Sequence, residues 1–354
     1  MQIRVCFIYP WATFGGVERV LLNRVLAFKH YLPEISVDIY FLHDSGGLVP
    51  LAAAMTQYGL SAISSISIIS SLDRDYDLAF IIDCPQAIDL CVRRSQRYVV
   101  ECHTSYAENR GYLANLPDTC ERVITPSSIF SDLIRNEIPC LPAPVSELRN
   151  FVPWDIPSQE FPFDNCLPRW SRKPILFFGR LDRLKDPLSL LDTFLMLERR
   201  RKGEFMLLFC GPRSSEIDFD KEISKRSLKS LSVVLPPVPF ASAGRLLNAV
   251  SHSGGLFVSP SQGESFGLSA AEAISSLVPV VLSNIKTHVE LVKGYEKNFI
   301  YPLGDNKSLS ERIESVFDNY TGACSAMAAA RTAFSAAAFI DDWKLLFQEL
   351  DIAQ

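Results

Sequence analysis

The stretch LFVSPSQGESFGLSAAEAISSLVPVVL, residues 256–282, decides the fold. It begins with the apolar run 256–258, continues through a turn rich in Ser, Pro and Gly, predicts a helix that starts near Phe266, and ends in the apolar run 280–282. Two strands joined by a crossover helix lie parallel in one sheet. The stretch therefore predicts a parallel α/β domain.

The same alternation of apolar runs and helix-period segments extends over the rest of the chain. Further strands are predicted at 4–9, 37–43, 78–83, 98–103, 123–125, 175–178, 205–210, 233–235 and 299–301, and helices at 17–31, 188–201, 307–319, 323–334 and 341–350. The predicted strands are continuously apolar, as expected when helices cover both faces of a parallel sheet. We therefore expect two Rossmann-like, doubly wound domains.

The predicted domains meet where the alternation stops, near Asn150, and where four prolines follow within 157–174. We predict an N-terminal domain over 1–153, a C-terminal domain over 154–335, and a C-terminal helix within 336–354 that packs back toward the N-terminal domain. The carboxyl ends of both sheets are then expected to face a shared cleft, where open α/β folds bind ligands.

The composition excludes several classes of protein. Of the 354 residues, 48% are hydrophobic and 21% are charged, and the net charge is -5, so the chain is globular and lacks the basic surface of a nucleic-acid binder. No uncharged apolar run reaches the about 18 residues that a transmembrane helix needs, and the first apolar stretch is too short for a signal peptide. The nine cysteines form no C-x-x-C spacing that would indicate a zinc site or a redox pair.

These observations predict a cytoplasmic protein. The basic residues Arg93, Arg94 and Arg97 leave peripheral contact with the inner face of a membrane as an alternative, although three charges on an acidic domain are more typical of an ordinary surface.

Two glutamates flank the predicted helix start in the stretch 256–282. Backbone N–H groups at the start of a helix have no partner within it, and with the helix dipole they attract an anion or a sugar oxygen. Glu264 lies at this end and Glu272 lies eight residues on, about 12 Å along a helix that rises 1.5 Å per residue. This spacing suits a ligand that lies lengthwise. The alternative is a helix start with one favourable glutamate and one solvated glutamate.

Two cations and two glycines lie where other strands end. Arg180 and Lys185 follow the predicted strand 175–178, and together they can neutralise a diphosphate without a metal. Gly15 and Gly16 precede a predicted helix and permit a ligand to approach the backbone amides closely. Either feature alone is also typical of an ordinary surface loop.

Seven short motifs follow one another along the chain: GGVE (15–18), ECHTS (101–105), FFGRLDRLKD (177–186), E-x7-E (264–272), PVV (279–281), YPLGD (301–305) and FSAAAFIDDW (334–343). With these motifs the chain resembles the retaining GT-B glycosyltransferases of family 4, the glycosyl transferases group 1. The resemblance implies a GT-B fold and a nucleotide-diphosphate sugar donor, UDP- or GDP-linked, held by the second domain. It also implies an acceptor held by the first domain, and neither cofactor nor metal.

The resemblance implies roles for individual residues. The catalytic set consists of His103, Glu264, Arg180 and Lys185, and the donor-binding set of Gly15, Gly16, Arg180, Lys185, Glu264, Ser265, Phe266, Gly267, Leu268 and Glu272. Within these sets, Arg180 and Lys185 would contact the diphosphate. Glu264 and His103 would contact the transferred sugar, and Glu272 would contact the ribose.

The chain departs from the family pattern at three glycines. Asp186 stands for the glycine after the lysine, Leu277 for the glycine before PVV, and residues 235–237 for a glycine turn. Two D-x-D sequences, 73–75 and 218–220, match the metal motif of another glycosyltransferase fold, but they precede a strand or open a helix. We therefore predict no metal site there.

The expected function is that of a retaining glycosyltransferase in polysaccharide, lipopolysaccharide or glycolipid assembly, with a carbohydrate or lipid-linked glycan as acceptor. Two alternatives stay open at this point. A nucleotide-sugar epimerase of the same fold would isomerise or hydrolyse the donor without an acceptor. A non-catalytic, two-lobed sugar-binding protein would bind free sugar tightly and turn over the donor slowly.

Overall fold

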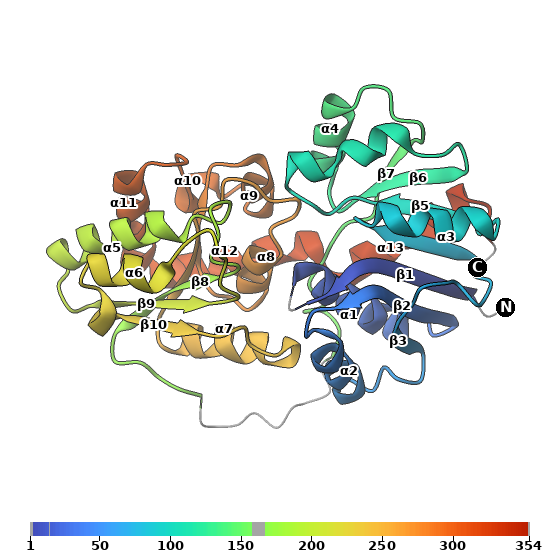
Figure 1. Ribbon diagram of the computed structural model, residues 1–354. Helices are drawn as coiled ribbons and strands as arrows, with labels where there is room; N and C mark the ends of the chain where they lie inside the picture. The colour runs from blue at the N-terminus through green and yellow to red at the C-terminus, as the bar shows by residue number, and fades with distance from the viewer. Residues whose placement is uncertain (1–2, 14, 158–166, 353–354) are drawn as a thin grey trace. The chain divides into compact units, whose positions relative to one another are not determined.

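The computed structural model describes residues 3–13, 15–157 and 167–352. Contacts within the chain divide it into two compact units: one is Met1–Gln159 with Phe334–Gln354, and the other is Glu160–Ala333. Each unit is built around its own parallel sheet (Figure 1). The two sheets confirm the predicted pair of doubly wound α/β domains.

The N-terminal unit contains a seven-stranded parallel sheet in the order β3-β2-β1-β4-β5-β6-β7. Its strands are β1 (Ile3–Ala12), β2 (Ile35–Asp44), β3 (Ser64–Ile68), β4 (Leu78–Ile82), β5 (Tyr98–Glu101), β6 (Cys120–Thr125) and β7 (Val145–Glu147). The order reverses between β1 and β4, because β2 and β3 extend the sheet on one side of β1 and the later strands on the other. Open α/β sheets bind ligands at the carboxyl ends of the strands beside such a reversal, so the loops after β1 and β4 are candidate positions, and the loop after β5 lies next to them.

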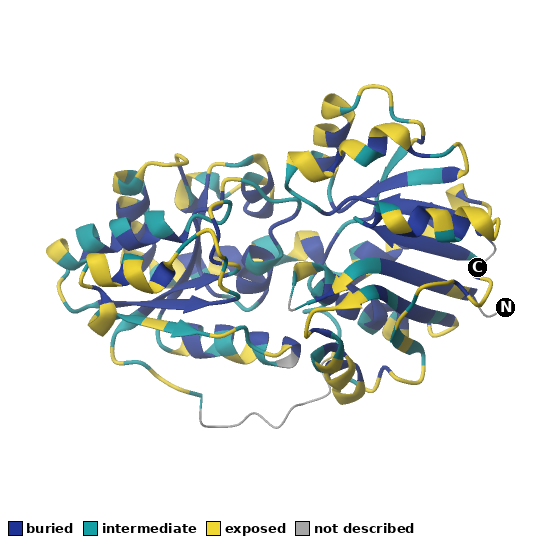
Figure 2. Ribbon diagram, viewed as in Figure 1, coloured by how far each residue is buried: buried dark blue, intermediate teal, exposed yellow. Residues whose placement is uncertain are grey.

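The α-helices in the described part of this unit are α1 (Gly16–Tyr31), α2 (Leu48–Gln57), α3 (Ile88–Arg93), α4 (Ser128–Glu137) and α13 (Ala336–Glu349). Sequence periodicity missed α2, α3, α4, β3 and β7. The edge strands β3 and β7 contain no fully buried residue, so they show no buried face with a period of two. The sequence of α2 is apolar on nearly all sides, so its buried face, Leu51, Ala54 and Met55, does not stand out from the sequence. Figure 2 shows the central strands buried and the outer helix faces exposed.

The chain returns to the N-terminal unit through α13. The Asp155 carboxylate accepts the backbone N–H of Ala336 at 2.8 Å and so caps the start of the helix. Trp343 is fully buried, and its ring centroid lies 4.5 Å from that of Phe28 and 5.2 Å from that of Phe80. By contacts, the described residues up to 157 and from Phe334 onward belong to the N-terminal unit, and the predicted bounds 1–153, 154–335 and 336–354 stay predictions.

One helical stretch, Tyr320–Glu349, is long and apolar enough to cross a membrane by length and composition alone, with a mean hydropathy of 1.3. It consists of α12 (Tyr320–Ala330), a short 3-10 segment and α13, with Ser335 outside any helix. The division between the two units falls within it. The apolar side of α13 is buried in the core of the N-terminal unit, and 39% of the apolar window of this stretch is buried within the protein.

The C-terminal unit contains a six-stranded parallel sheet in the order β10-β9-β8-β11-β12-β13. Its strands are β8 (Lys173–Phe178), β9 (Phe205–Cys210), β10 (Ser232–Leu235), β11 (Leu256–Ser259), β12 (Val280–Ser283) and β13 (Ile300–Tyr301). Its helices are α5 (Pro187–Arg200), α6 (Phe219–Lys225), α7 (Ala243–His252), α8 (Leu268–Ser275), α9 (Lys286–Leu291), α10 (Glu296–Phe299), α11 (Asn306–Asp318) and α12. The order reverses between β8 and β11, and the loops after these two strands carry the predicted donor-binding residues Arg180, Lys185 and 264–267.

Candidate functional site

The loop after β8 places two predicted site residues around one buried carboxylate. Arg180 donates from Nε to Asp182, and the backbone N–H of Lys185 donates to Asp182 Oδ1 at 2.9 Å. Asp182 is 1% exposed, whereas the Arg180 side chain is 46% exposed. Asp182 therefore orients the loop that carries both cations. Sequence reasoning missed this residue, although it lies within the motif 177–186.

Gly211, directly after β9, packs against the backbone of the same loop at Gly179. Its φ is +149°, and a Cβ at this position would lie 2.1 Å from the carbonyl oxygen of Gly179. Any side chain here would push apart the loops after β8 and β9 and displace Arg180. Gly211 is a further position that sequence reasoning missed.

Two of the three departures from the family pattern keep the backbone that glycine would adopt. Asp186 has a φ of 49° and Leu277 a φ of 58°, in the left-handed region that favours glycine. The Asp186 carboxylate also caps α5, because it accepts the backbone N–H of Ser189 at 3.3 Å and the hydroxyl of Ser189 at 2.7 Å. The loop that follows Lys185 is therefore shaped by a cap where the family has a glycine.

Lys185 and Glu264 contact each other across the two loops. Lys185 Nζ lies 2.5 Å from Glu264 Oε1, and the two side chains are 25% and 12% exposed. Burial raises the pKa of Glu264, but the Lys185 ammonium more than offsets this, so that the pKa lies below its ordinary value. Glu264 is therefore an anion at neutral pH. The structure brings together the residue predicted for the diphosphate and the residue predicted for the sugar.

The helix after β11 starts later than the sequence predicted. α8 begins at Leu268, and its N-cap Gly267 has a φ of +84°, a conformation that interrupts the helix. Glu264, Ser265 and Phe266 therefore precede the helix, and the estimate of about 12 Å of helix between the two glutamates was wrong, because helical rise applies only from Leu268 onward. Glu272 is buried within α8, which excludes the interpretation that it is solvated.

Side chains from β12 and α9 hold the loop that carries Glu264. Thr287 donates from Oγ1 to the Glu264 carbonyl oxygen at 2.8 Å, and Ser283 donates from Oγ to the Ser261 carbonyl oxygen at 2.6 Å. His288 Nδ1 lies 3.0 Å from Ser283 Oγ. Sequence reasoning missed these residues. The sequence did offer a signal for them, because the hydroxyl of Ser283 ends the strand at 280–283 and Thr287 and His288 follow it closely.

His288 makes the stability of the C-terminal unit depend on pH. Burial lowers the pKa of His288 from 6.5 to about 4, because the charged form is poorly solvated there. The unfolded chain binds a proton below pH 6.5, whereas the folded chain binds it only below about pH 4, so stability is lost as the pH falls between these values. We expect a loss of about 3 kcal/mol from this residue.

The measurement is the free energy of unfolding by urea at several pH values, for the wild type and for H288N. The asparagine keeps a donor near Ser283 but does not titrate, so the variant should show a shallower slope over this window. H252N, at the exposed C-terminal end of α7, is the control and should match the wild type. Equal slopes in all three proteins would exclude His288 as the cause.

The loop after β1 is shaped by Glu18, the last residue of the GGVE motif. The Glu18 carboxylate accepts the backbone N–H of Thr13 at 2.5 Å, its hydroxyl at 2.7 Å and the backbone N–H of Gly15 at 3.2 Å. A Cβ on Gly15 would lie 2.8 Å from this carboxylate, and one on Gly47 would lie 2.1 Å from the Thr13 carbonyl oxygen. Gly16 has no atom within 4 Å of a built Cβ. Gly15 and Gly47 are thus needed for the loop itself, and Gly16 is the position open to a ligand.

His103 lies just beyond β5, which ends at Glu101 and not at 103 as predicted. Its Nε2 lies 2.8 Å from Glu101 Oε2, and Asn150 Nδ2 lies 3.5 Å from its Nδ1. The side chain is 5% exposed. Both ring nitrogens therefore face protein groups, and the contact of His103 with a donor sugar stays a prediction.

Two buried carboxylates flank His103 and have opposite pKa shifts. Burial raises the pKa of Glu101, but the Arg24 guanidinium and His103 more than offset this and lower it to about 2. The pKa of Asp83 is raised, because burial outweighs its hydrogen bonds. Asp83 accepts the backbone N–H of His103 at 3.0 and 3.2 Å. Asp83 and Arg24 were not singled out from the sequence.

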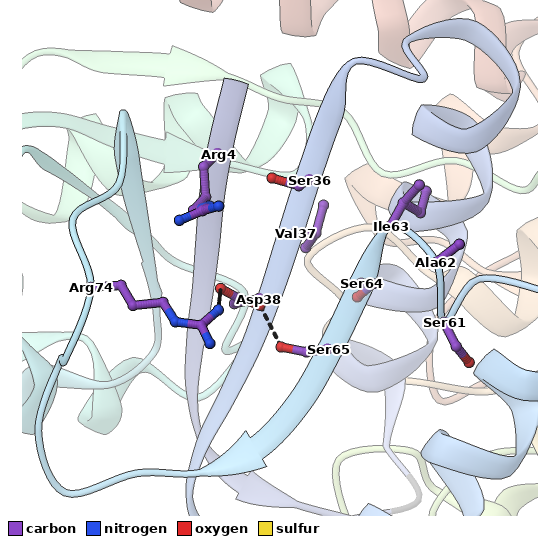
Figure 3. Close-up of a pocket in the computed structure, with 10 residues that line it drawn as sticks. All are labelled: Arg4, Ser36, Val37, Asp38, Ser61, Ala62, Ile63, Ser64, Ser65 and Arg74. Atoms are coloured by element: carbon purple, nitrogen blue, oxygen red, sulfur yellow. Dashed lines mark hydrogen bonds and ion pairs between the residues drawn. The ribbon is translucent and has the colours of Figure 1, made fainter. Parts of the chain in front are cut away.

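A hollow of about 200 Å³ lies at the opposite edge of the N-terminal sheet (Figure 3). Arg4 and Ser36 line it near the amino ends of β1 and β2, away from the loops of the predicted site. Asp38 bonds to Ser65 and lies 3.6 Å from Arg74, as the dashed lines in Figure 3 mark. Asp38 is thus paired within the protein, and the position of the hollow is not that of a site at the carboxyl ends of the strands.

The two D-x-D sequences lie on the surface. Asp75 pairs with Arg94 at 2.7 Å, and Asp220 pairs with Arg213 at 2.8 Å. Among residues 3–13, 15–157 and 167–352, no three His, Cys, Asp or Glu side chains gather as a metal would require. Independence from metal stays a prediction.

Comparison with known proteins finds a family model that matches the C-terminal unit. Residues 168–333 match the family model described as Glycosyl transferases group 1. D-inositol 3-phosphate glycosyltransferase of Pseudarthrobacter chlorophenolicus is 32% identical over 114 residues, which cover 31% of this chain and 26% of that protein. The match thus spans about a quarter of the length of this curated relative.

Two solved structures resemble the whole chain. Anabaena HepE in complex with UDP and glucose superposes with a TM-score of 0.74 at 14% identity, covering 98% of this chain and 100% of that chain. TarM of S. aureus, in complex with fondaparinux, α-GlcNAc-glycerol and UDP, superposes with a TM-score of 0.76 at 12% identity, covering 98% and 99%. At this identity the likeness shows the fold, which is GT-B.

Proposed function

We propose that the chain is a retaining glycosyltransferase of family 4 that moves a sugar from a UDP- or GDP-linked donor to an acceptor hydroxyl. The contact between Lys185 and Glu264 is the observation that carries this proposal. It joins the loop after β8 to the loop after β11, the two loops beside the reversal of strand order. Both loops lie within the segment that matches the Glycosyl transferases group 1 model.

The C-terminal unit supplies the groups that a nucleotide-diphosphate sugar needs. Arg180 and Lys185 bind the diphosphate. The backbone N–H groups at the start of α8, where the helix dipole is positive, also attract it. Glu264 accepts hydrogen bonds from the hydroxyls of the transferred sugar. Glu272, further along α8, accepts those of the ribose. HepE and TarM, which share this fold, are complexes with UDP, and this supports a nucleotide diphosphate as the ligand class.

For the transfer step we propose the route that the resemblance to family 4 implies. The bond between the anomeric carbon and the leaving phosphate oxygen breaks through an oxocarbenium-like state, and the acceptor oxygen bonds to the same face of the sugar. The acceptor's proton passes to the leaving diphosphate. Arg180 and Lys185 stabilise the negative charge that develops on that diphosphate, so the protein contributes mainly positioning and electrostatic stabilisation.

The N-terminal unit is assigned to the acceptor, with Gly16 close to the donor phosphates and His103 close to the transferred sugar. We propose a carbohydrate or lipid-linked glycan as acceptor, in polysaccharide, lipopolysaccharide or glycolipid assembly. A cytoplasmic location, with peripheral contact at the inner face of the membrane, fits a lipid-linked acceptor.

The experiment that tests the proposed function is a thermal-shift screen of the purified chain with UDP-, GDP-, ADP- and dTDP-sugars. Binding raises the melting temperature, and we expect donors of one base to do so. Conversion of a donor to its epimer would instead indicate an epimerase. A shift with free sugar and none with any nucleotide would indicate a sugar-binding protein and overturn the proposal.

Transfer should not require a divalent cation. Arg180, Lys185 and the N-terminus of α8 supply the positive charge that a metal would otherwise provide at the diphosphate. We therefore expect sugar transfer, or slow donor hydrolysis, to continue in excess EDTA and to change only modestly with added Mg²⁺ or Mn²⁺. Complete loss in EDTA with rescue by Mn²⁺ would exclude this clamp of two cations and redirect attention to Asp73 and Asp75.

A further inference from the structure

An ion pair lies fully buried beneath the predicted site of the N-terminal unit. Arg24 of α1 donates from Nη1 to Glu101 Oε1 at 2.7 Å and from Nη2 to Glu101 Oε2 at 3.0 Å. Both side chains are 0% exposed. A buried pair is often no more stable than a packed apolar pair, because both charges lose their hydration. The pair therefore calls for a role other than stability.

Glu101 connects this pair to His103. Its Oε2 lies 2.8 Å from His103 Nε2 as well as bonding to Arg24. A carboxylate held ionised by Arg24 can only accept hydrogen bonds, so His103 Nε2 carries the proton and donates it. In the neutral ring Nδ1 is then an acceptor, and the Asn150 amide nitrogen faces it at 3.5 Å. The tautomer and the orientation of the ring thus follow from one carboxylate.

The same pair ties together two parts of the predicted site. Arg24 lies on α1, whose first residue is Gly16, and Glu101 is the last residue of β5, two positions before His103. The backbone of His103 is fixed separately by Asp83. The ring of His103 is therefore held by groups that do not themselves face a ligand.

We propose that Glu101 is a positioning residue that keeps the proton of His103 on Nε2 and the ring at the carboxyl end of β5, and that Arg24 holds Glu101 for this purpose. The proposal rests on the proposed function, in which His103 contacts the donor sugar. It predicts that the rate of sugar transfer depends on a hydrogen-bond acceptor at position 101. The affinity of the C-terminal unit for the donor should not depend on it.

Two double variants isolate the acceptor from the ion pair. R24M/E101Q and R24M/E101L both remove the two charges, so neither leaves an unpaired buried charge. Only glutamine at 101 can still accept from His103 Nε2. We expect E101L in this background to lower kcat about 10- to 100-fold relative to E101Q, as expected for a misplaced group near the reacting atoms. KM for the donor and the affinity for bare nucleotide diphosphate should differ little.

The control is R201M/E204L. Arg201 and Glu204 form a partly exposed two-bond pair between α5 and β9 of the C-terminal unit, with distances of 2.6 and 2.7 Å, and neither residue belongs to the proposed site. Circular dichroism and thermal unfolding establish that each variant is folded. The control should keep the wild-type kcat. Equal kcat values for the two Arg24 variants, whether high or low, would overturn the positioning role.

Ring-nitrogen NMR of the wild type tests the tautomer independently of activity. The chain has five histidines, and H103Q identifies the signals of His103 in ¹⁵N-histidine-labelled protein. We expect the neutral ring of His103 to carry its proton on Nε2. A proton on Nδ1, or averaging between both tautomers, would overturn the proposal even if a double variant fails to fold. If the wild type binds no nucleotide and cleaves no donor, the proposed function is overturned. The NMR measurement would still determine which ring nitrogen of His103 carries the proton.

Discussion

Replacing Glu264 with glutamine should lower kcat for sugar transfer by about 100-fold while leaving the binding of bare nucleotide diphosphate intact or slightly tighter. The carboxylate accepts from the sugar in the proposed complex, and it is ionised because Lys185 lowers its pKa. In the free protein it also competes with phosphate for Lys185, at 2.5 Å. E264Q removes that competition.

Glu272 should behave in the opposite way. E272Q should weaken bare nucleotide binding about 10-fold, because the ribose is part of the bare nucleotide and the transferred sugar is not. Calorimetry with nucleotide diphosphate and steady-state kinetics with the donor separate the two effects. E290Q, on the exposed side of α9, is the control and should change neither. Equal loss of nucleotide affinity in E264Q and E272Q would contradict the assigned order along the donor.

Removing either cation should weaken nucleotide diphosphate binding by about 1.5 to 3 kcal/mol, which is roughly 10- to 100-fold. R180A removes a guanidinium that Asp182 orients, and K185A removes the ammonium nearest Glu264. The nearby R183A is the matched control, because Arg183 lies exposed in the same loop. Calorimetry with the free nucleotide diphosphate measures all three. Wild-type affinity in both R180A and K185A would remove the phosphate assignment.

The sequence predicted the two α/β domains correctly because buried parallel strands are continuously apolar, and such runs can be recognised in the sequence. The stretch 256–282 forms β11, α8 and β12 as expected. The predicted helix start was wrong because Gly267 has a positive φ, so α8 begins only after it. The spacing of hydrophobic residues does not reveal such a backbone conformation. Edge strands such as β3 and β7 were missed because neither buries a full face.

The candidate site was predictable where a residue type carries the chemistry, as with Lys185 and Glu264, which the structure brings into contact. It was not predictable where a residue acts through another. Asp182 and Arg24 lie in ordinary strand-loop and helix contexts, and only the folded chain shows which groups they hold. Asp186 departs from the family's glycine, but it keeps the left-handed backbone that a glycine would adopt. Its carboxylate caps α5 through Ser189.

Proton NMR of donor turnover tests the central claim most directly. The purified chain is incubated with each α-linked nucleotide sugar of the UDP, GDP, ADP and dTDP series, and the spectrum follows both the nucleotide and the anomeric proton of the sugar. The account predicts that donors of one base release nucleoside diphosphate, and that the sugar first appears as the α-anomer or in an α-linkage. Release of the β-anomer first would contradict retention. Absence of cleavage and of nucleotide binding across the whole series would contradict the account as a whole.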